Sequence, residues 1–440
     1  MAQKTGSTSK KVAAPKGTRD VYPEDMLRRR YIAKVWRDTA IRHGFEEIDG
    51  PTFEQSELYA VKSGDGILGE LFQAFSGKDP REVERVQETG RGPFAMRPEF
   101  TPTLARMYAA RAAQLPKPVK WFSVGPYFRA ERPQRGRLRE FLQWNCDVVG
   151  LPGGAEESDA LTLASRGEMD ADVVLASQDS MKAFGLSAQD ATVQIGNRDV
   201  VELLLRHYGI RDETLRDAFD LLDRLHKLPR DAIVEEAKRL NLNWSGLSIK
   251  AASVERSFDA GTRRFRHTTT HGIWDRSEDG IAKVEKRVKS RMELDLSAIG
   301  LDELFAALKA SRGESAVFNL GIVRGLAYYT GTVFEIIAEG ERAVAGGGRY
   351  DGLVELLGGP ATPAVGFAMG DVVLGLVLEE KGLMPEGAAL MDAVSGPSAS
   401  VRPDAFVFTP DEGRDGDVRR LVAGLRRGVE SEGWLSRDGR

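Results

Sequence analysis

The stretch from Trp121 to Gly150 constrains the fold of this chain more than any other. Its two ends, WFSVGPYF and FLQWNCDVV, are rich in aromatic and β-branched residues, which favour strands. The segment between them, RAERPQRGRLRE, contains Pro133 and Gly136, which are typical of turns. It also contains five arginines: Arg129, Arg132, Arg135, Arg137 and Arg139. The pattern predicts a β-hairpin with an arginine-rich loop.

The arginine loop has no lysine, which indicates a binding site for an anion. A guanidinium group offers a planar fork of donors that matches phosphate and carboxylate oxygens, whereas a lysine offers a point charge. The alternative is a charged loop tip that Glu131 and Glu140 hold in place.

The segment FRAERPQRGRLREFLQ resembles motif 2 of the class II aminoacyl-tRNA synthetases, most closely the histidine-specific family. VRGLAYYTGTVFEI (Val323 to Ile336) and AGGGRYDGLVELLGG (Ala345 to Gly359) resemble further motifs of that family, in the same order. The resemblance covers residues 15 to 380. It implies an α+β fold, in which helices flank an antiparallel sheet, with an inserted helical domain and a partial C-terminal α/β domain. The implied activity joins histidine to tRNA(His) with ATP and Mg²⁺, in a homodimer whose interface includes motif 1.

Composition sets the outer limits. A chain of 440 residues holds two or three domains, and its net charge of −4 means that contacts with nucleic acid must come from local basic patches. The single cysteine, Cys146, excludes an internal disulfide and a cysteine-rich metal site. The sequence has no apolar run of membrane length and no apolar secretory core near its start. We therefore expect a cytoplasmic protein that does not enter the membrane.

The patterns divide the chain into six segments. We predict a disordered tail (1–16), a catalytic core with motifs 1 and 2 (17–194), a helical insertion (195–315), the rest of the core (316–380), a linker (381–403) and a partial anticodon-binding domain (404–440). The linker is predicted from its Ala, Gly, Ser and Pro content. The last segment begins like the anticodon-binding domain of the family and holds one strand and one helix, which leads us to expect a truncated domain.

Glu99 and Thr101 lie where a short strand is expected to meet a helix. A carboxylate there could hold an ammonium group, or it could merely complement the helix dipole. The resemblance places the amino-acid-binding pattern Arg-Pro-Glu-x-Thr at Arg97 to Thr101, which favours the first role.

Gln143, Asn145 and Asp147 alternate with apolar residues on the second strand of the hairpin. A period of two puts them on one face, either toward a polar ligand or toward solvent. The resemblance assigns Gln143 to the backbone of the histidine substrate and Asp147 to its imidazole.

Arg324, Tyr328 and Tyr329 follow a bend that Gly321 and Gly325 indicate. A tyrosine suits stacking on an imidazole, although two core tyrosines are the alternative. The resemblance makes Arg129 and Arg324 the catalytic cations, at the α-phosphate and the substrate carboxylate. It assigns ATP binding to Arg129, Glu131, Arg137 and Arg324. The run GGGRYDGL lacks the Lys-Ser/Thr of a P-loop, so its glycines indicate close backbone packing instead.

Two positions depart from the family. Ala327 stands where an aspartate is usual, and the motif 3 region from Val365 to Leu378 contains Asp371 but no arginine to hold the terminal phosphate of ATP. This leaves Arg132, Arg135 or Arg137 as candidates for that phosphate. We expect no metal site in the protein, because three threonines between His267 and His271 disfavour the helix that their spacing would need.

These departures keep a second function open. A synthetase-like regulatory subunit of ATP phosphoribosyltransferase would bind histidine without an anticodon domain, and the short C-terminal segment, Ala327 and the missing arginine favour it. The complete motif 2, Glu99 and Arg324 favour the ligase. A third possibility, an RNA-binding module without chemistry, would not bind ATP.

Overall fold

The computed structural model describes most of the chain. It covers residues 12–63, 71–151, 159–207, 210–224, 228–240, 253–259, 264–271, 275–277, 280–282, 288–291, 300–311, 316–319, 321–322, 328–338, 343–402, 405, 407–410 and 414–427. Within this part, no helix is long and apolar enough to cross a membrane.

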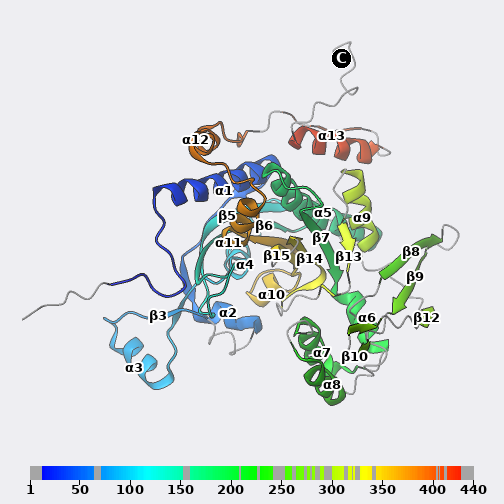
Figure 1. Cartoon of the computed structure of the whole chain (residues 1–440), viewed down its shortest axis with the longest axis horizontal. Coiled ribbons are helices and arrows are strands. Elements are labelled where there is room, and N and C mark those ends of the chain that lie inside the picture. Colours follow the sequence, from blue (N-terminus) through cyan, green and yellow to red (C-terminus); the bar gives the residue numbers. More distant parts are fainter. Residues whose placement is uncertain are drawn as a thin grey trace, which may run out of the picture.

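A mixed sheet of eight strands forms the centre of the molecule (Figure 1). In spatial order its strands are β1 (Glu46–Glu47), β5 (Val119–Phe128), β6 (Glu140–Val149), β16 (Ala364–Gly370), β15 (Ala343–Arg349), β14 (Thr330–Ala338), β7 (Ala191–Asn197) and β13 (Ala316–Phe318). The six inner strands are antiparallel, as expected. The short edge strands β1 and β13 run parallel to their neighbours. The α+β architecture is therefore confirmed, with parallel edges that the sequence did not predict.

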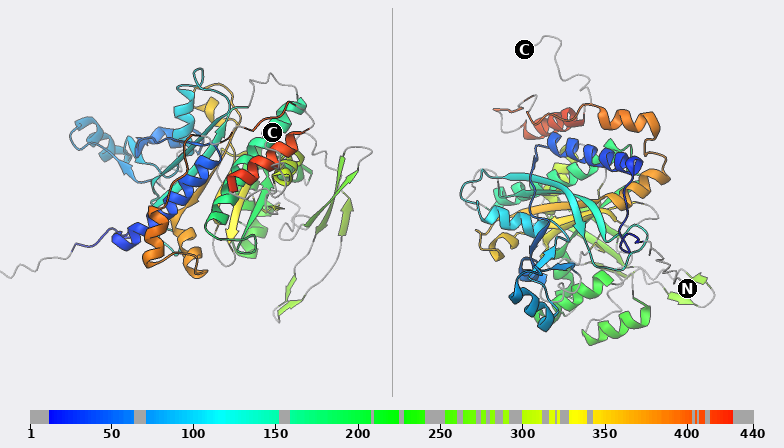
Figure 2. Two further views of the ribbon diagram at one scale, coloured as in Figure 1. Left: turned by 90° about the horizontal axis from the view of Figure 1, so that it is seen from above. Right: turned by 90° about the vertical axis from the view of Figure 1, so that its left-hand side faces the viewer.

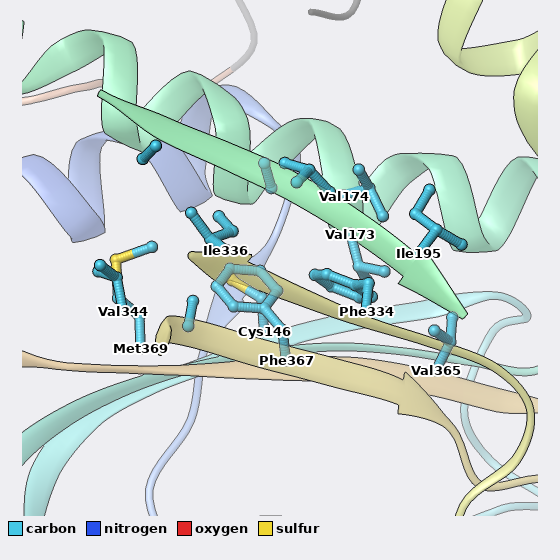
Figure 3. Close-up of a cluster of buried hydrophobic side chains, with 14 of the residues drawn as sticks. Cys146, Val173, Val174, Ile195, Phe334, Ile336, Val344, Val365, Phe367 and Met369 are labelled. Atoms are coloured by element: carbon cyan, nitrogen blue, oxygen red, sulfur yellow. The ribbon is translucent and has the colours of Figure 1, made fainter. Parts of the chain in front are cut away.

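Long helices cover one face of this sheet. They are α1 (Pro23–Arg42), α5 (Asp159–Ala183), α9 (Leu301–Ala310) and α11 (Asp371–Glu380). Figure 3 shows the apolar layer beneath them, where Val173 and Val174 of α5 meet Phe334 and Phe367 of the sheet. Cys146 lies in the same layer and is fully buried, so it acts as a small apolar side chain.

The opposite face carries α4 (Thr101–Ala109) and α10 (Leu353–Leu356). Their side chains Leu104 and Val354 belong to a second core with Tyr127 and Val333 of the sheet. Along β6 the side chains alternate between these two cores, because successive residues of a strand point to opposite faces. Trp144, Cys146 and Val148 join the first core, which leaves Gln143, Asn145 and Asp147 on the face of α4 and α10.

The N-terminal part adds a small three-stranded sheet, made of β2 (Phe53–Gln55), β4 (Phe94–Met96) and β3 (Gln73–Ala74), and two helices, α2 (Ser56–Ser63) and α3 (Pro80–Thr89). Residues 64–90 show no clear periodicity, so their sequence predicts a loop or irregular insertion. Helix α3 shows that this prediction is wrong for 80–89. Asp79 caps its first turn by accepting from the Arg81 N–H at 3.0 Å, Pro80 occupies its first turn, and Gly90 ends it with a left-handed φ of 67°.

The insertion is partly helical. Helices α6 (Arg198–His207), α7 (Asp212–Arg224) and α8 (Arg230–Arg239) agree with the prediction. Strands follow them: β8 (Ser253–Asp259), β9 (Arg264–His271) and β12 (Val288–Arg291) form one sheet, and β10 (Asp275–Ser277) pairs with β11 (Gly280–Ala282). His267 and His271 both lie on β9, so they do not have the helical spacing of a metal site. Strand β7 also carries the central sheet on to Asn197, beyond the predicted core boundary at 194.

The predicted linker is not an unstructured connection. It contains α12 (Gly387–Ser395), which packs against α1, as two views of the chain agree (Figures 1 and 2). The segment after α12 is held by α1 as well: Lys34 Nζ donates to the Pro397 carbonyl at 2.8 Å, and Asp38 Oδ1 accepts from the Ala399 N–H at 2.9 Å.

Helix α13 (Asp415–Arg427) matches the predicted C-terminal helix. The strand expected before it is absent from the described residues of DAFVFTP, which have no regular structure. Arg427 anchors α13 to the body by donating to Asp179 Oδ1 at 2.8 Å and to the Ser311 carbonyl at 3.0 Å. The division of the chain into domains stays a prediction.

Candidate active site

The polar face of β6 forms the floor of the candidate site. Gln143, Asn145 and Asp147 are each at most 3% exposed, so the alternative of a solvated strand face is wrong. Gln143 Nε2 donates to Asn145 Oδ1 at 2.8 Å, and Asn145 Nδ2 donates to the Tyr127 hydroxyl at 3.2 Å. This chain of hydrogen bonds fixes the amides before any ligand arrives.

Asp147 is the most constrained acid of the site. Its Oδ1 accepts a hydrogen bond from the Tyr350 hydroxyl at 2.6 Å, while its buried Oδ2 has no partner among the described residues. The pKa of Asp147 is raised to about 7, mainly by burial. The hydrogen bond from Tyr350 lowers this pKa, and the negative charge of Glu99 raises it further. A buried carboxylate oxygen without a donor is costly, which makes this atom a candidate ligand contact.

Glu99 lies between β4 and α4, as predicted, and Thr101 begins that helix. The Glu99 carboxylate accepts a short hydrogen bond from the Tyr328 hydroxyl. Burial raises the pKa of Glu99, and the Tyr328 bond and the charge of Arg129 partly offset that rise. Glu99 is therefore bound by a tyrosine hydroxyl and lies within the charge influence of Arg129, and its role in holding an ammonium group stays a prediction.

The tyrosines line the same region. Tyr328 makes edge contacts with Tyr329 at 5.1 Å and with Tyr350 at 6.2 Å between ring centroids. All three rings are at most 8% exposed and belong to the core beneath α4, so the interpretation as core tyrosines holds for their rings. Their hydroxyls nevertheless engage the acids: Tyr328 binds Glu99, and Tyr350 binds Asp147.

Arg97 supports the site from below. It is 1% exposed, its Nη1 donates to Asp49 Oδ1 at 2.6 Å, and its Nε donates to the Pro126 carbonyl at 3.0 Å. Its guanidinium also lies 4.8 Å from the ring centroid of Tyr127. Arg97 therefore joins the segment before α4 to the hairpin.

The arginine loop separates into inner and outer members. Arg129, at the end of β5, donates from Nε to the Pro98 carbonyl at 3.2 Å and lies 5.0 Å from the ring centroid of Phe141. Arg137 donates to Glu131 Oε1 at 2.6 Å, so these two predicted ATP ligands form an ion pair across the loop. Arg132 and Arg135 are exposed. Arg324 and Ala327 lie outside the described residues.

Asp371 occupies the motif 3 region and is buried at the start of α11. Its Oδ1 accepts from the Leu142 N–H at 2.9 Å, and its Oδ2 pairs with Arg19 Nη2 at 2.5 Å. The β6 ladder with β16 ends at Gln143 and Gly370, so the Asp371 side chain takes over as the acceptor for the next residue of β6.

The structure therefore brings predicted site residues together on the polar face of β6: Glu99, Gln143, Asp147, Tyr328 and Tyr329. The charge of Arg129 acts on Glu99. Two residues that the sequence analysis had not singled out also belong there. One is Tyr350, which follows the glycine run AGGGR. The sequence analysis interpreted the glycines of this run and overlooked the tyrosine beside them, whose hydroxyl donates to Asp147. Gly366 faces Asp147 across the sheet, and a Cβ at this position would lie 1.9 Å from Asp147 Oδ1.

A family model described as histidyl-tRNA synthetase matches residues 17–371. The chain belongs to this family. A histidine–tRNA ligase of Opitutus terrae is 38% identical over 380 residues, which is 84% of this chain and 75% of the relative. The chloroplastic and mitochondrial histidine–tRNA ligase of Arabidopsis thaliana is 33% identical, covering 85% of this chain and 68% of the relative. The ligase of Thermococcus kodakarensis is 32% identical and covers 94% and 82%.

Solved structures agree on the fold. The histidyl-tRNA synthetase of Nostoc superposes with a TM-score of 0.59 at 21% identity and covers 85% of this chain and 76% of its own. A Bacillus halodurans protein described as an ATP phosphoribosyltransferase regulatory subunit/histidyl-tRNA synthetase superposes with a TM-score of 0.57 at 20% identity, covering 88% and 85%. At these identities the likeness concerns the fold alone, so it does not favour the regulatory function.

Proposed function

We propose that this chain is a histidine–tRNA ligase whose chemistry takes place on the polar face of β6. In the first step a carboxylate oxygen of histidine attacks the α-phosphorus of ATP, and the bond to the departing diphosphate breaks. In the second step a ribose hydroxyl at the 3′ end of tRNA attacks the histidyl carbonyl, and AMP leaves. No covalent enzyme intermediate is needed, so the protein contributes position and charge.

One observation carries this proposal. Two buried carboxylates, Asp147 and Glu99, lie close enough to raise the pKa of Asp147, and each is held by a tyrosine hydroxyl. Histidine carries two separate nitrogen donors, its ammonium group and its imidazole. Two oriented carboxylates can accept one hydrogen bond from each of these donors. A site built in this way also rejects analogues that lack one of the donors, because a buried acceptor would then stay unpaired.

The family resemblance, supported by the geometry of the site, suggests the following roles. Asp147 accepts the imidazole N–H through its unpartnered Oδ2, and Glu99 with Thr101 takes the ammonium group. Gln143 binds the substrate backbone, and the rings of Tyr328 and Tyr329 pack beside the imidazole.

The charge of Arg129 lowers the pKa of Glu99. We place the α-phosphate beside Arg129, with Arg324 on the substrate carboxylate. Glu131 and Arg137 orient the nucleotide from the loop. Mg²⁺ enters with ATP as part of that substrate, and the described residues hold no group of three or more acidic, histidine or cysteine side chains placed to bind a metal ion.

The regulatory-subunit alternative is not favoured. The curated relatives quoted above are all named histidine–tRNA ligases and align with 84% or more of this chain. We further infer that the chain is cytoplasmic and forms a homodimer. Large apolar side chains at the surface near motif 1, where Tyr22 is 67% and Phe53 is 57% exposed, support the dimer. Light scattering on the purified chain tests this inference, and a monomeric mass overturns it.

Histidine-dependent exchange of diphosphate into ATP tests the ligase directly. We expect exchange by the native chain and a loss of roughly 10²–10³ in rate for Arg129→Ala, the usual effect of removing one preorganised donor from a developing charge. Arg81→Ala is the matched control, because the Arg81 side chain is 90% exposed on α3. Exchange by Arg129→Ala at the level of the control would show that the arginine loop is only a surface feature.

A further inference from the structure

A short segment before α1 is bound to the arginine loop. Arg139, near the end of that loop, donates from its backbone N–H to the Gly17 carbonyl at 2.7 Å. Its Nη1 donates to the neighbouring Lys16 carbonyl at 3.3 Å. We call this segment, residues 15–19, the N-terminal clasp.

The clasp lies directly against the loop at Gly17. Gly17 has a left-handed φ of 89°, and a Cβ at this position would lie 2.5 Å from Pro133 Cγ and 3.0 Å from Arg139 Cδ. Contacts of a Cβ shorter than 3.0 Å are essentially not found, so a side chain here must push the loop and the clasp apart. Only glycine combines this backbone conformation with so close an approach.

The far end of the clasp is fixed to α11. Arg19 Nη2 pairs with Oδ2 of the buried Asp371 at 2.5 Å. The tip of the arginine loop reaches the same helix, because a Cβ on Gly136 would lie 3.2 Å from Val373 Cγ2. The clasp and the loop therefore share α11 as a common support.

Arg139 connects the clasp to the residues that we assign to ATP. Its Nε donates to the Glu131 carbonyl at 3.0 Å, and its own carbonyl accepts from the Arg129 N–H at 2.9 Å. The Glu131 carboxylate in turn accepts from Arg137 at 2.6 Å. Arg139 thus holds both the clasp and the part of the loop that contains these three candidate ligands of the nucleotide.

The charge of the loop explains why such a support matters. Five arginines stand between positions 129 and 139, and their like charges repel one another when no phosphate lies among them. A loop that is already ordered loses less conformational freedom when ATP binds. The region from Val365 to Leu378 contains no arginine, so the nucleotide depends the more on the cations of this loop.

We propose that the N-terminal clasp positions the arginine loop for ATP. Gly17, Arg19 and Arg139 are then positioning residues, which act through the ligands on the loop and do not touch the substrate themselves. This inference rests on the proposed function, because it concerns the nucleotide of that reaction. It separates the two small substrates: loss of the clasp should weaken the binding of ATP and spare that of histidine, whose proposed contacts lie on the polar face of β6.

Titration calorimetry of Gly17→Ala with Mg²⁺–ATP and, separately, with histidine tests the proposal. Gly44→Ala is the matched control, because Gly44 has a similar left-handed φ of 78° but a Cβ there meets no atom within 4 Å. Both substitutions strain the backbone alike, and only the first displaces the loop. We expect Gly17→Ala to bind ATP about tenfold more weakly than the control, the usual effect of losing one hydrogen bond to a charged group, and both chains to bind histidine alike.

The possible failures are distinguishable. Native ATP affinity in a folded Gly17→Ala chain would overturn the inference and leave the ligase function intact. Equal losses of affinity for ATP and histidine would also overturn it, because they indicate general destabilisation. If the native chain itself binds no ATP, the proposed function fails and the inference fails with it.

Arg139→Lys gives a second test that does not depend on the folding of Gly17→Ala. A lysine keeps the charge but lacks the planar fork that reaches the Glu131 and Lys16 carbonyls together. ATP binding should therefore weaken by a similar factor although no charge is lost, and native affinity would contradict the inference. The double variant of Gly17→Ala and Arg139→Lys should bind ATP about as weakly as either single variant, since both break the same contact. Fully additive losses would overturn the role of the clasp.

Discussion

Replacing Gly366 by alanine should disturb histidine binding selectively, because this glycine makes room for Asp147. The two residues are paired across β16 and β6. A Cβ at position 366 would lie 1.9 Å from Asp147 Oδ1, 2.6 Å from its Cγ and 2.9 Å from the Cys146 carbonyl oxygen. The backbone carbonyl belongs to the centre of the sheet and has little freedom to move. The Asp147 carboxylate must therefore yield.

The size of the effect follows from these distances. Cβ contacts shorter than 3.0 Å are essentially not found, so Oδ1 must move by about 1.1 Å from its position at 1.9 Å. A displacement of about 1 Å at a reacting group costs on the order of 10²-fold in rate. Overpacking a filled core also costs roughly 1–3 kcal/mol of stability. We expect the KM for histidine to rise, or kcat/KM for histidine to fall, by about 10²-fold, with a much smaller change in the KM for ATP.

The assay is diphosphate exchange at varied histidine and varied ATP, with the unfolding midpoint of each variant measured in urea. Gly370→Ala is the matched control, since Gly370 ends the same strand and a Cβ there meets no atom within 4 Å. The control should keep native kinetics. A folded Gly366→Ala chain with a native KM for histidine would refute the placement of the imidazole at Asp147.

Three further predictions concern buried charges. Asp147→Asn should raise the free energy of unfolding by roughly 2–4 kcal/mol at pH 8 and by little at pH 4. A buried acid whose pKa rises from 3.8 to about 7 loses stability as pH increases through that window, and the amide does not; equal denaturation midpoints at pH 8 would contradict this. Arg349→Met should cost about 3–5 kcal/mol, because the Arg349 guanidinium lies 2.9 Å from both Asp170 and Asp351 and its loss leaves the buried Asp170 without its cation, while Asp351 keeps Arg166; a native urea midpoint would argue against it. Asp371→Ala should destabilise the chain by roughly 1–3 kcal/mol by leaving the Leu142 N–H without its acceptor, and a urea midpoint unchanged from the native one would count against that role.

The sequence predicted the local parts of the site well. The motif 2 hairpin and the polar face of β6 follow from composition and from a period of two, both of which act within a few residues. The Arg-Pro-Glu-x-Thr segment lay at the expected junction of strand and helix. The motif resemblance supplied the roles, which residue patterns alone left open.

Contacts between distant segments were not predictable in the same way. Tyr350 reaches Asp147 from a segment about 200 residues later, and the neighbouring glycines drew attention to backbone freedom instead. Helix α12 contains good helix formers (Ala, Leu and Met), but the Gly, Ser and Pro residues around it led to the prediction of a linker, and the helix docks on α1. Helix α3 was missed as well, although its cap residues Asp79 and Gly90 stand in the sequence.

The strand order of the sheet has a consequence for synthesis of the protein on the ribosome. Asp147 and Gly366 are direct neighbours across β6 and β16, yet 219 positions separate them in the chain. At roughly 5–20 residues per second, β6 waits about 10–45 s for its partner strand to be made. During that time the hairpin is complete, but one edge of β6 still lacks its ladder and the apolar side of the sheet lacks part of its cover. A nascent chain stalled between residues 150 and 360 should therefore recruit chaperones that bind exposed strand edges, and release them once Gly370 has left the exit tunnel.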